Sequence, residues 1–526
     1  MAANKNNQYT SIPREKFAFV NAGEHLSDKK FEDKPISFLR DGFNRFCKNR
    51  ASVVAAIIII STVLFAFITP LLYSEVPEMN PYYQRMGPRN LFLSNTFGIA
   101  DGTVTEDFSD KSMIMTLGIG VGAENWDGRG VTLEEGRNSK YQPIKNAGEV
   151  DQTLDGRRNP VYVFKGAEVE TYLRVGFIYR DVEQAEYDRI LAWQEETGIR
   201  VIYPLLNEDN TADASDPNLW YKNNSKYVPM YTKENGNLGK LELSADMVLE
   251  DNYMRDENGN IVYWKYHGGG TLETAQKRIR VLYYNYYQYL YGCEPEYIFG
   301  TDIQGYDMAL RVAGGIKLSL LVAVATCLIN FILGALYGAV EGYYGGWIDI
   351  ILERVSDILY NVPFIVVATL FNLHLKDYVG VLWTLVFAYV VTGWIPTAAR
   401  VRSQFYRFKN QEYVMAARTL GARDRRIIWK HIFPNTLGTL ITSSALAIPS
   451  AILSESTLSF LGIINLGTAE STSVGTLLSE AQGAWENAPH LMIVPAIVIS
   501  LLMISFNLFG NGLRDAFNPS LRGVEE

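Results

Sequence analysis

The segment EYVMAARTLGARDRRIIWKHIFPN (412–435) decides the fold of this chain, through what it contains and what flanks it. It predicts two short helical pieces separated at Gly421, and Ile427, Ile428 and Trp429 give the second piece an apolar face. A glycine between two helical pieces is typical of a left-handed or bent backbone. The segment is basic and too short for an enzyme domain, and uncharged apolar runs lie on both sides of it.

Six apolar runs approach the ~20 residues that a helix needs to cross a bilayer. The first, ASVVAAIIIISTVLFAFITPLL (51–72), begins too far from the start of the chain for a signal peptide and predicts a retained anchor. The other five runs occupy residues 316–340, 347–372, 379–399, 435–453 and 491–510. The sequence therefore predicts an α-helical membrane protein with six transmembrane helices.

The basic residues orient these spans. Arg40, Arg45, Lys48 and Arg50 precede the first run, which predicts a cytoplasmic N-terminus. Counting inward, residues 400–431 return to the cytoplasm, and they carry nine Lys and Arg residues. The loop between the last two runs contains Glu residues and no Lys or Arg, as an external loop should. We expect a multi-pass protein of the cell membrane with both termini cytoplasmic.

The third run is less apolar than the others, because Glu353, Arg354 and Asp357 lie near its start. Such charges either pair with one another at helical spacing or face an aqueous cavity. In the second run, the small residues Gly334, Ala335 and Gly338 predict a close approach of another helix.

Between the first two runs, residues 74–298 are polar and long enough for a complete external domain. Strand-like stretches at 172–180 and 200–206 flank a helical period at 181–198, which predicts a β-α-β order. Asn258-Gly259 predicts a hairpin, and residues 271–292 predict a Tyr-rich helix whose Tyr residues could anchor at the membrane interface. GIGVG (118–122) does not complete a dinucleotide-binding pattern and predicts a flexible loop.

Composition excludes other classes of protein. Lys and Arg total 48 against 57 Asp and Glu, a net charge of −9, which argues against nucleic acid as the main partner. The three cysteines are too scattered for a disulfide framework, and no His and Cys residues stand at metal-ligand spacing. We therefore expect no catalytic residue, no metal and no cofactor in this chain.

The 412–435 segment resembles the EAA loop of permease subunits in binding-protein-dependent ABC importers, and is similar to the dipeptide and oligopeptide branch. The matching residues are Glu412, Tyr413, Val414, Ala416, Ala417, Arg418, Gly421, Ala422, Ile428, His431, Pro434 and Asn435. A second stretch, FGTDIQGYDMALRVAGGIKLSL (299–320), resembles the one that precedes the second span in C-type subunits of oligopeptide permeases, as do LSFLG (458–462), 507–519 and the N-terminal anchor.

The resemblance has departures. The Glu that names the EAA loop is Met415 here, and Glu412, one turn earlier, is a candidate substitute. Tyr306 stands where the family has Arg, and Lys317 also replaces an Arg. Pro88 and Phe299 would be near neighbours in a typical member, so residues 74–298 are an insertion of which the family says nothing.

The resemblance implies an ABC importer type I permease fold, and the residues between its matching blocks predict an inserted extracytoplasmic α+β domain. The parts are a cytoplasmic tail (1–50), a first span (51–73), the insertion (74–298) and a five-helix core (299–526) with a coupling loop (400–434). The residues expected to couple to the ATPase are Glu412, Tyr413, Met415, Ala416, Ala417, Arg418, Gly421 and Ala422. Candidates for the translocation path are Asn361, Pro363, Pro449 and Ser450, because proline breaks helices where a cavity can satisfy carbonyl groups.

The implied function is transport of oligopeptides or dipeptides without enzymatic activity in this chain, which has no G-x-x-x-x-G-K-[ST] phosphate loop. The implied partners are a B-type permease, two ATP-binding subunits that hold ATP and Mg²⁺, an external peptide-binding protein and membrane lipid. Alternatives are a nickel or other small-solute importer, a membrane sensor with an external ligand-binding domain, and a gated channel.

Overall fold

The structure is a computed structural model. It describes residues 38–72, 79–154, 160–207, 216–222, 245–268, 276–467 and 472–517. Most of the predicted cytoplasmic tail, residues 1–37, therefore lies outside the described residues.

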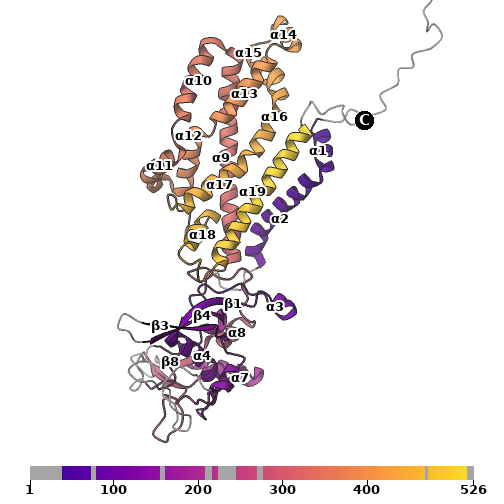
Figure 1. Ribbon diagram of the computed structural model, residues 1–526. Coiled ribbons are helices and arrows are strands. Elements are labelled where there is room, and N and C mark those ends of the chain that lie inside the picture. Colours follow the sequence, from indigo (N-terminus) through magenta and orange to yellow (C-terminus); the bar gives the residue numbers. More distant parts are fainter. Residues whose placement is uncertain are drawn as a thin grey trace, which may run out of the picture.

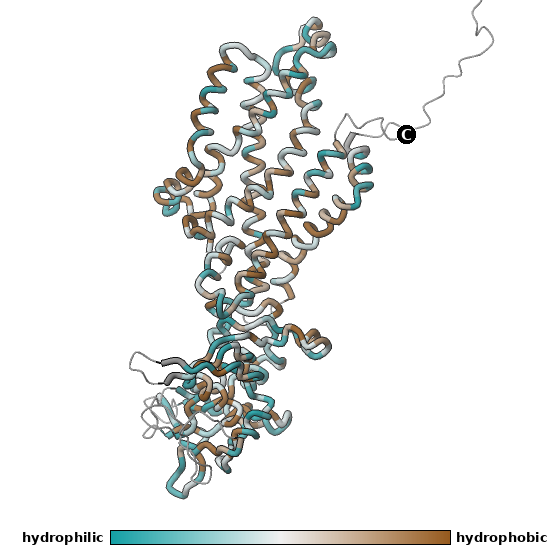
Figure 2. The backbone as a smooth tube through the Cα atoms, viewed as in Figure 1, coloured by the Kyte–Doolittle hydropathy of each residue, from teal (hydrophilic) through white to brown (hydrophobic). Residues whose placement is uncertain are grey.

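The chain forms a bundle of long helices with a separate domain at one end of it (Figure 1). Apolar residues run along the bundle helices, whereas the domain is largely hydrophilic on its outside (Figure 2). The bundle and associated helices are α1 (Phe38–Lys48), α2 (Arg50–Leu72), α9 (Met308–Tyr344), α10 (Gly346–Tyr360), α11 (Phe364–Val379), α12 (Val381–Thr392), α13 (Ile395–Phe408), α14 (Glu412–Thr419), α15 (Asp424–Arg426), a π-helical turn η4 (Ile427–Ile432), α16 (Phe433–Ala445), α17 (Ala447–Phe460), α18 (Val474–Ala481) and α19 (His490–Phe517).

Among the described residues, five helical stretches are long and apolar enough to cross a membrane: Arg50–Leu72, Met308–Tyr344, Val381–Phe408, Asp424–Phe460 and His490–Phe517. A sixth span results if the pair α10 and α11, bent by 74°, is counted as one. The fold class predicted from the apolar runs, a helical membrane protein with an inserted domain, is confirmed.

The span predicted over 347–372 is formed by two helices, α10 and α11, rather than by one straight helix. The helix breaks after Tyr360, and the break has a local cause in Pro363. Proline disfavours helical backbone at the residue before it and has no N–H to donate, so α10 ends and α11 begins around it. The Asn361 side chain donates to the Asp357 carbonyl at 2.6 Å and covers the end of α10.

Close packing of α9 is confirmed, and the partner is α13. A Cβ atom on Gly338 would lie 2.2 Å from the Ala398 carbonyl oxygen, and one on Gly334 would lie 2.7 Å from the Trp394 carbonyl oxygen. Only glycine permits this approach of the two backbones. The helices α9 and α13 are therefore closely packed along their length, and this packed pair, which we call the wall, supports the segment that projects after α13.

The inserted domain, which we call the external domain after the side of the membrane predicted for it, has two four-stranded antiparallel sheets among its described residues. In the first, β4 (Pro160–Glu170) pairs with β1 (Thr103–Ser109), β2 (Ile144–Asn146) and β3 (Glu149–Leu154). In the second, β8 (Gln276–Leu282) pairs with β5 (Phe177–Val182), β6 (Ile202–Tyr203) and β7 (Trp264–His267). The helices of the domain are α3 (Leu91–Phe97), α4 (Asp110–Glu124), α5 (Leu133–Arg137), α6 (Thr171–Arg174), α7 (Gln184–Thr197) and α8 (Tyr283–Tyr291).

The predicted β-α-β order is present as β5, α7 and β6, with β8 lying between the two strands. The first strand starts later than predicted, because residues 171–174 form the turn α6. The hairpin at Asn258-Gly259 is confirmed by the antiparallel bridge between Arg255 and Ile261 and by φ of +83° at Gly259.

Two predictions for the domain are wrong. The Tyr-rich helix is shorter, because residues 276–282 form the central strand β8. Tyr283, Tyr284, Tyr286 and Tyr287 of this helix are buried in the core of the domain and therefore cannot serve as interfacial anchors. GIGVG is not a loop but the last part of helix α4, where Gly122 leaves room for Trp220, whose Nε1 donates to the Gly118 carbonyl at 2.7 Å.

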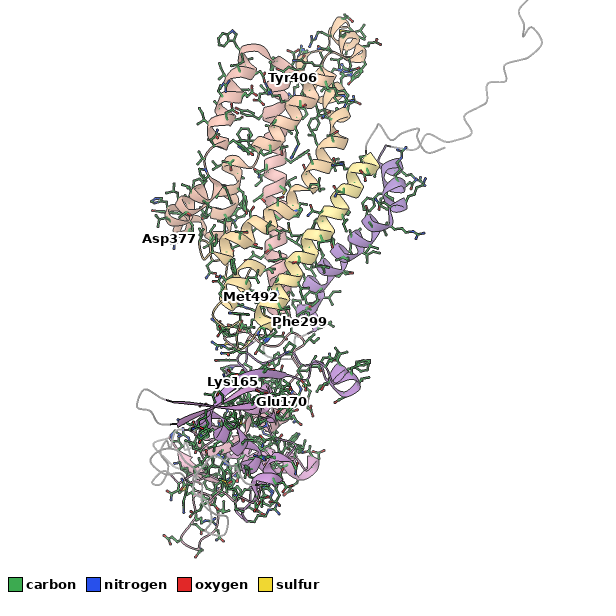
Figure 3. The ribbon with its side chains drawn as sticks, in the orientation of Figure 1. Lys165, Glu170, Phe299, Asp377, Tyr406 and Met492 are labelled. Atoms are coloured by element: carbon green, nitrogen blue, oxygen red, sulfur yellow. The ribbon has the colours of Figure 1, made fainter. Side chains whose placement is uncertain are left out.

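The insertion leaves and rejoins the membrane core at one place. The Arg89 N–H donates to the Tyr297 carbonyl at 2.8 Å, and the Thr301 N–H donates to the Met86 carbonyl at 3.1 Å. The end of the insertion and the residues just after it, where Phe299 lies (Figure 3), are thus hydrogen-bonded to residues near its start. The segments around Pro88 and Phe299, which the resemblance implies would be near neighbours without the insertion, therefore lie close together even though the domain is inserted between them.

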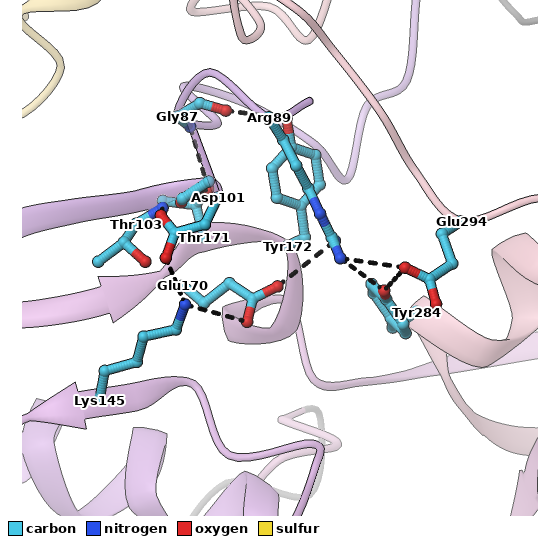
Figure 4. A network of polar contacts seen from close by, with 11 residues as sticks. Gly87, Arg89, Asp101, Thr103, Lys145, Glu170, Thr171, Tyr172, Tyr284 and Glu294 are labelled. Atoms are coloured by element: carbon cyan, nitrogen blue, oxygen red, sulfur yellow. Dashed lines mark hydrogen bonds and ion pairs between the residues drawn. The ribbon is translucent and has the colours of Figure 1, made fainter. Parts of the chain in front are cut away.

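A buried ion network anchors this junction (Figure 4). Arg89, 8% exposed, lies between Glu170 at 3.4 Å and Glu294 at 3.2 Å, and donates to the Tyr284 hydroxyl at 2.9 Å. Lys145 adds a second cation, 3.9 Å from Glu170. Burial raises the pKa of Glu170, while the charge of Arg89 opposes that shift. The network joins the start of the domain to β4 and to the segment that follows α8.

Candidate functional site: the segment between α13 and α16

The candidate site is the segment 412–422, which we call the coupling segment. It consists of α14 and the turn that follows it, at the end of the bundle opposite the external domain (Figure 1). At the turn, the Gly421 N–H donates to the Arg418 carbonyl and the Ala422 N–H donates to the Ala417 carbonyl, both at 3.0 Å. With φ of +80°, Gly421 completes a left-handed helix cap, so the predicted backbone is confirmed.

Few side chains hold the coupling segment to the bundle. Val414 is fully buried and packs in a cluster that includes Tyr343, Phe405 and Ile427. The Tyr343 hydroxyl bonds the Asp424 carboxylate and accepts a 3.4 Å contact from Arg418. One apolar anchor and one tyrosine from α9 thus position α14 against the wall formed by α9 and α13.

The other side of α14 is uncovered. Leu420 is 87% exposed, Met415 is 52% exposed, and Ala416 is exposed between them in sequence. These uncovered apolar side chains lie near one another in sequence at the tip of a projecting helix, where they are available for contact with another surface. We call residues Met415, Ala416 and Leu420 the apolar tip.

The remaining predicted coupling residues lie around this tip. Glu412 is exposed in the first turn of α14, where a negative charge suits the helix dipole. Tyr413 turns back, and its hydroxyl accepts from the Asn435 side chain at 3.2 Å. Ala417 and Ala422 are half-buried against the bundle. The structure brings all eight residues into one small element, and their role in coupling stays a prediction.

An ion cluster that sequence analysis missed connects α13 to α10. Arg402 binds Asp349 through two contacts of 2.6 and 2.8 Å, and Glu353 through two contacts of 2.8 and 3.0 Å. Tyr406, labelled in Figure 3, donates to Asp349 at 2.7 Å. The predicted pairing at helical spacing is confirmed for Arg354 and Asp357, at 3.1 Å, whereas Glu353 pairs with Arg402 of another helix. Arg402 lies about 50 residues after Asp349 and Glu353, so no local sequence pattern pointed to this pairing.

The four candidates for the translocation path occupy two places. Asn361 and Pro363 lie at the bend between α10 and α11, while Pro449 is buried and Ser450 exposed near the start of α17. Tyr389 of α12 connects the two places. Its ring stacks on Phe364 at 4.6 Å, and its hydroxyl donates to the Ala451 carbonyl at 3.3 Å. The role of these residues in a path stays a prediction.

A buried carboxylate was also missed. Glu455 of α17 is fully buried and accepts from Ser319 of α9 at 2.9 Å and from Ser459 at 3.0 Å. A carboxylate within a span has to be paired or hydrogen-bonded, and the bond from Ser319 joins α9 to α17, whereas the bond from Ser459 lies within α17. The only sequence signal was its position three residues before LSFLG.

Two protein families match the chain. Residues 330–523 match the binding-protein-dependent transport system inner membrane component, and residues 37–90 match the N-terminal transmembrane domain of oligopeptide transport permease C. The dipeptide transport system permease protein DppC of Bacillus subtilis (strain 168) is 41% identical over 43% of this chain and 69% of its own length. The oligopeptide transport system permease protein OppC of the same organism is 40% identical over 43% of this chain and 72% of its own length.

The chain belongs to the C-type permeases of binding-protein-dependent ABC importers. It is therefore a multi-pass membrane protein and a transport subunit. The two family matches leave residues 91–329 uncovered, a stretch that includes most of the external domain. Among solved structures, the inward-facing MetNI methionine ABC transporter is similar to it at 15% identity, with a TM-score of 0.34, over 40% of this chain and 98% of that one.

Proposed function

We propose that this permease subunit forms half of the membrane pathway of an ATP-driven importer of oligopeptides or dipeptides. The permeases to which it is similar are named for dipeptide and oligopeptide transport. The substrate reaches the pathway from an external peptide-binding protein, and a B-type permease supplies the other half. Two ATP-binding subunits hold ATP and Mg²⁺, since this chain carries no phosphate loop.

The apolar tip is the observation that carries this proposal. Leu420 and Met415 are uncovered although they lie on a well-formed helix with a closed cap. A helix that presents side chains in this way fits a groove on a partner protein. The ATP-binding subunit is that partner, and the coupling segment is where its movement enters the permease.

The contacts of the coupling segment connect α14 to the helices of the bundle, so that displacement of α14 is passed on to them. Val414 and Tyr343 transmit displacement of α14 to α9, and the Arg402 cluster transmits it from α13 to α10. The bend at Asn361 and Pro363 is the place where α10 can turn relative to α11. ATP-driven closure thereby shifts the bundle between inward-open and outward-open states.

The proposed orientation places the coupling segment in the cytoplasm. Helix α1 and the last turns of α19 lie at the same end of the bundle as α14, and Phe46 contacts Phe509 with ring centroids 5.3 Å apart (Figure 1). The nine basic residues between 400 and 431 favour this side as cytoplasmic. Both termini are then cytoplasmic and the inserted domain is external.

Co-purification tests the proposal. The tagged chain is extracted from its native membrane in mild detergent, and mass spectrometry identifies what accompanies it. We expect a second permease and ATP-binding subunits. A chain that purifies alone, while control complexes stay together, would contradict the assembly. Uptake of a labelled tripeptide, compared with uptake of Ni²⁺, then tests the substrate in cells that lack the chain and in cells that express it.

For the external domain we propose docking of the peptide-binding protein or shielding of the pathway mouth. Replacing residues 90–296 by a short Gly-Ser linker is feasible, because Arg89 and Tyr297 are already hydrogen-bonded at 2.8 Å. The affinity of the binding protein for the complex is measured with and without the domain. Unchanged affinity would remove the docking role.

A further inference from the structure

A basic hollow lies next to the coupling segment. It has a volume of about 630 Å³ and is lined by Arg423, Arg425, Arg426, Trp429 and Lys430. We call these five residues the basic hollow. Three isoleucines of the same helical stretch, Ile427, Ile428 and Ile432, are buried against the bundle. The hollow therefore opens away from the subunit's own core.

The four cations of the hollow have no counter-charge. None of them forms an ion pair or side-chain hydrogen bond with any residue that the structure describes, whereas the nearby Arg402 is fully engaged with carboxylates. The one acidic residue between 421 and 435 is Asp424, and its carboxylate is bound by the Tyr343 hydroxyl. Four positive charges thus surround one open volume, which calls for an anionic occupant.

The position of the hollow favours a lipid over a soluble anion. Trp429 and Lys430 belong to the continuous helical stretch Asp424–Phe460, which is long and apolar enough to span the membrane. The first turns of such a span lie in the headgroup layer, where Trp is enriched. Trp429 is 39% exposed and packs on Phe433 with centroids 5.0 Å apart, so its ring lines the hollow and also contacts the start of the apolar helix α16.

We infer that the basic hollow binds the headgroup of an anionic phospholipid. The guanidinium groups suit a phosphate, with which arginine forms paired hydrogen bonds, and the indole of Trp429 packs beside the glycerol and first acyl carbons. The apolar tip, formed by other residues, stays available for the ATP-binding subunit. The inference rests on the proposed orientation only for the leaflet concerned, which would be the cytoplasmic one.

Lipid titration of the purified full-length chain tests the inference. Dioctanoyl phosphatidylglycerol and dioctanoyl phosphatidylcholine are added in mild detergent, and native mass spectrometry measures the bound lipid. We expect the anionic lipid to bind at least tenfold more tightly. The triple variant Arg423→Gln, Arg425→Gln, Arg426→Gln should weaken phosphatidylglycerol binding by on the order of a hundredfold, since each basic residue near a headgroup contributes about a factor of five.

The matched control is Arg129→Gln, Lys165→Gln, Arg255→Gln, which removes the same charge from the external domain. It should bind phosphatidylglycerol as the unaltered chain does. Equal binding of the two lipids, or an unaffected triple variant with native circular dichroism, would overturn the inference. If the triple variant loses its helical signal, competition on the unaltered chain decides: full displacement by 10 mM inorganic phosphate would assign the hollow to a free anion and overturn the lipid.

The assembled transporter separates a lipid site from a protein interface. Phosphatidylglycerol should remain bound after the ATP-binding subunits are added. Its loss, together with a cross-link from position 426 to an ATP-binding subunit, would assign the hollow to that interface and overturn the inference. Because the readout is lipid binding, failure here is distinct from failure of the proposed transport function.

Discussion

The external domain and the coupling segment differ in how they are stabilised. The domain has an aromatic core, with Tyr83, Tyr172 and Trp220 fully buried, and the ion network of Arg89 at its base. The coupling segment has Val414 as its fully buried side chain and leaves Leu420 87% exposed. The domain buries its own apolar side chains, whereas the coupling segment leaves Leu420 and Met415 exposed. The packing of the added part is thus complete in itself, while the exposed side chains of the coupling segment are what the proposed contact with an ATP-binding subunit would cover.

The largest expected effect is on the coupling segment. Gly421→Trp places a bulky side chain where φ is +80° and disturbs both the helix cap and the seating of the apolar tip. We expect normal membrane insertion and abolished peptide uptake. Gly483→Trp is the control, because a side chain at Gly483 also meets open space but lies in a loop remote from α14. Retained uptake by Gly421→Trp at normal expression would remove the coupling role.

The next largest effect is on the external domain. Arg89→Ala leaves Glu170 buried without its main partner, and breaking a buried pair costs about 3–5 kcal/mol. We expect faster hydrogen exchange in β4, measured by mass spectrometry, without change in the helices of the core. Lys165→Ala breaks an exposed pair made from the same strand and should leave exchange unchanged; Figure 3 labels Lys165 together with Glu170, the partner of Arg89. Equal effects of the two variants would contradict the role of the network.

A smaller effect on peptide uptake is expected from the Arg402 ion cluster, which connects α13 to α10. Arg402→Gln removes charge-assisted hydrogen bonds to Asp349 and Glu353, worth about 1.5–3 kcal/mol each. Uptake should fall on the order of tenfold, because displacement of α13 no longer reaches α10. Arg354→Gln, whose side chain is 75% exposed, is the control and should transport normally. Equal uptake by both variants would mean that α10 moves without this cluster.

The smallest expected effect is on the pH dependence of stability, through Asp307 at the start of α9. Asp307 is buried and accepts from the Ala309 N–H at 2.7 Å, and burial raises its pKa to about 6. Its pKa in the unfolded chain is about 3.9. The folded state therefore binds the proton more tightly, so Asp307 stabilises the fold more at pH 5 than at pH 7.

Asp307→Asn should remove this contribution to the pH dependence, and Asn still caps a helix. The measurement compares hydrogen exchange of the loop 299–307 at pH 5 and pH 7 in the two proteins. Glu170 and Glu480, whose pKa values burial also raises, are present in both proteins and cancel in the difference. An unchanged pH dependence would show that Asp307 does not carry it.

The sequence predicted most of the membrane core and the local form of the coupling segment. Long apolar runs leave few alternatives to spanning helices, and Gly421 between two helical patterns predicted a left-handed or bent backbone, of which the structure has the left-handed form. Pro363 was visible in the third run, but the 74° bend depends on how the rest of the bundle accommodates the break.

The misses all depend on contacts between distant residues. The glycines of α4 resemble a loop until Trp220, about a hundred positions later, packs on them. Residues 276–282 look helical in isolation, yet they form the central strand because β5 is available to pair with them. In the sequence, Arg402 was one of nine basic residues that indicated a cytoplasmic segment, and its carboxylate partners come from a different helix, α10. No local pattern specifies such pairings.

Site-specific cross-linking at the apolar tip tests the central claim most directly. A photoreactive benzophenone amino acid replaces Leu420 in the full chain, and native membranes are irradiated before identification of the products. The control position is Tyr360, which is 63% exposed at the end of α10. We predict that position 420 cross-links to an ATP-binding subunit and that position 360 does not. Products with lipid alone at position 420, in membranes where the transporter is assembled, would contradict the account.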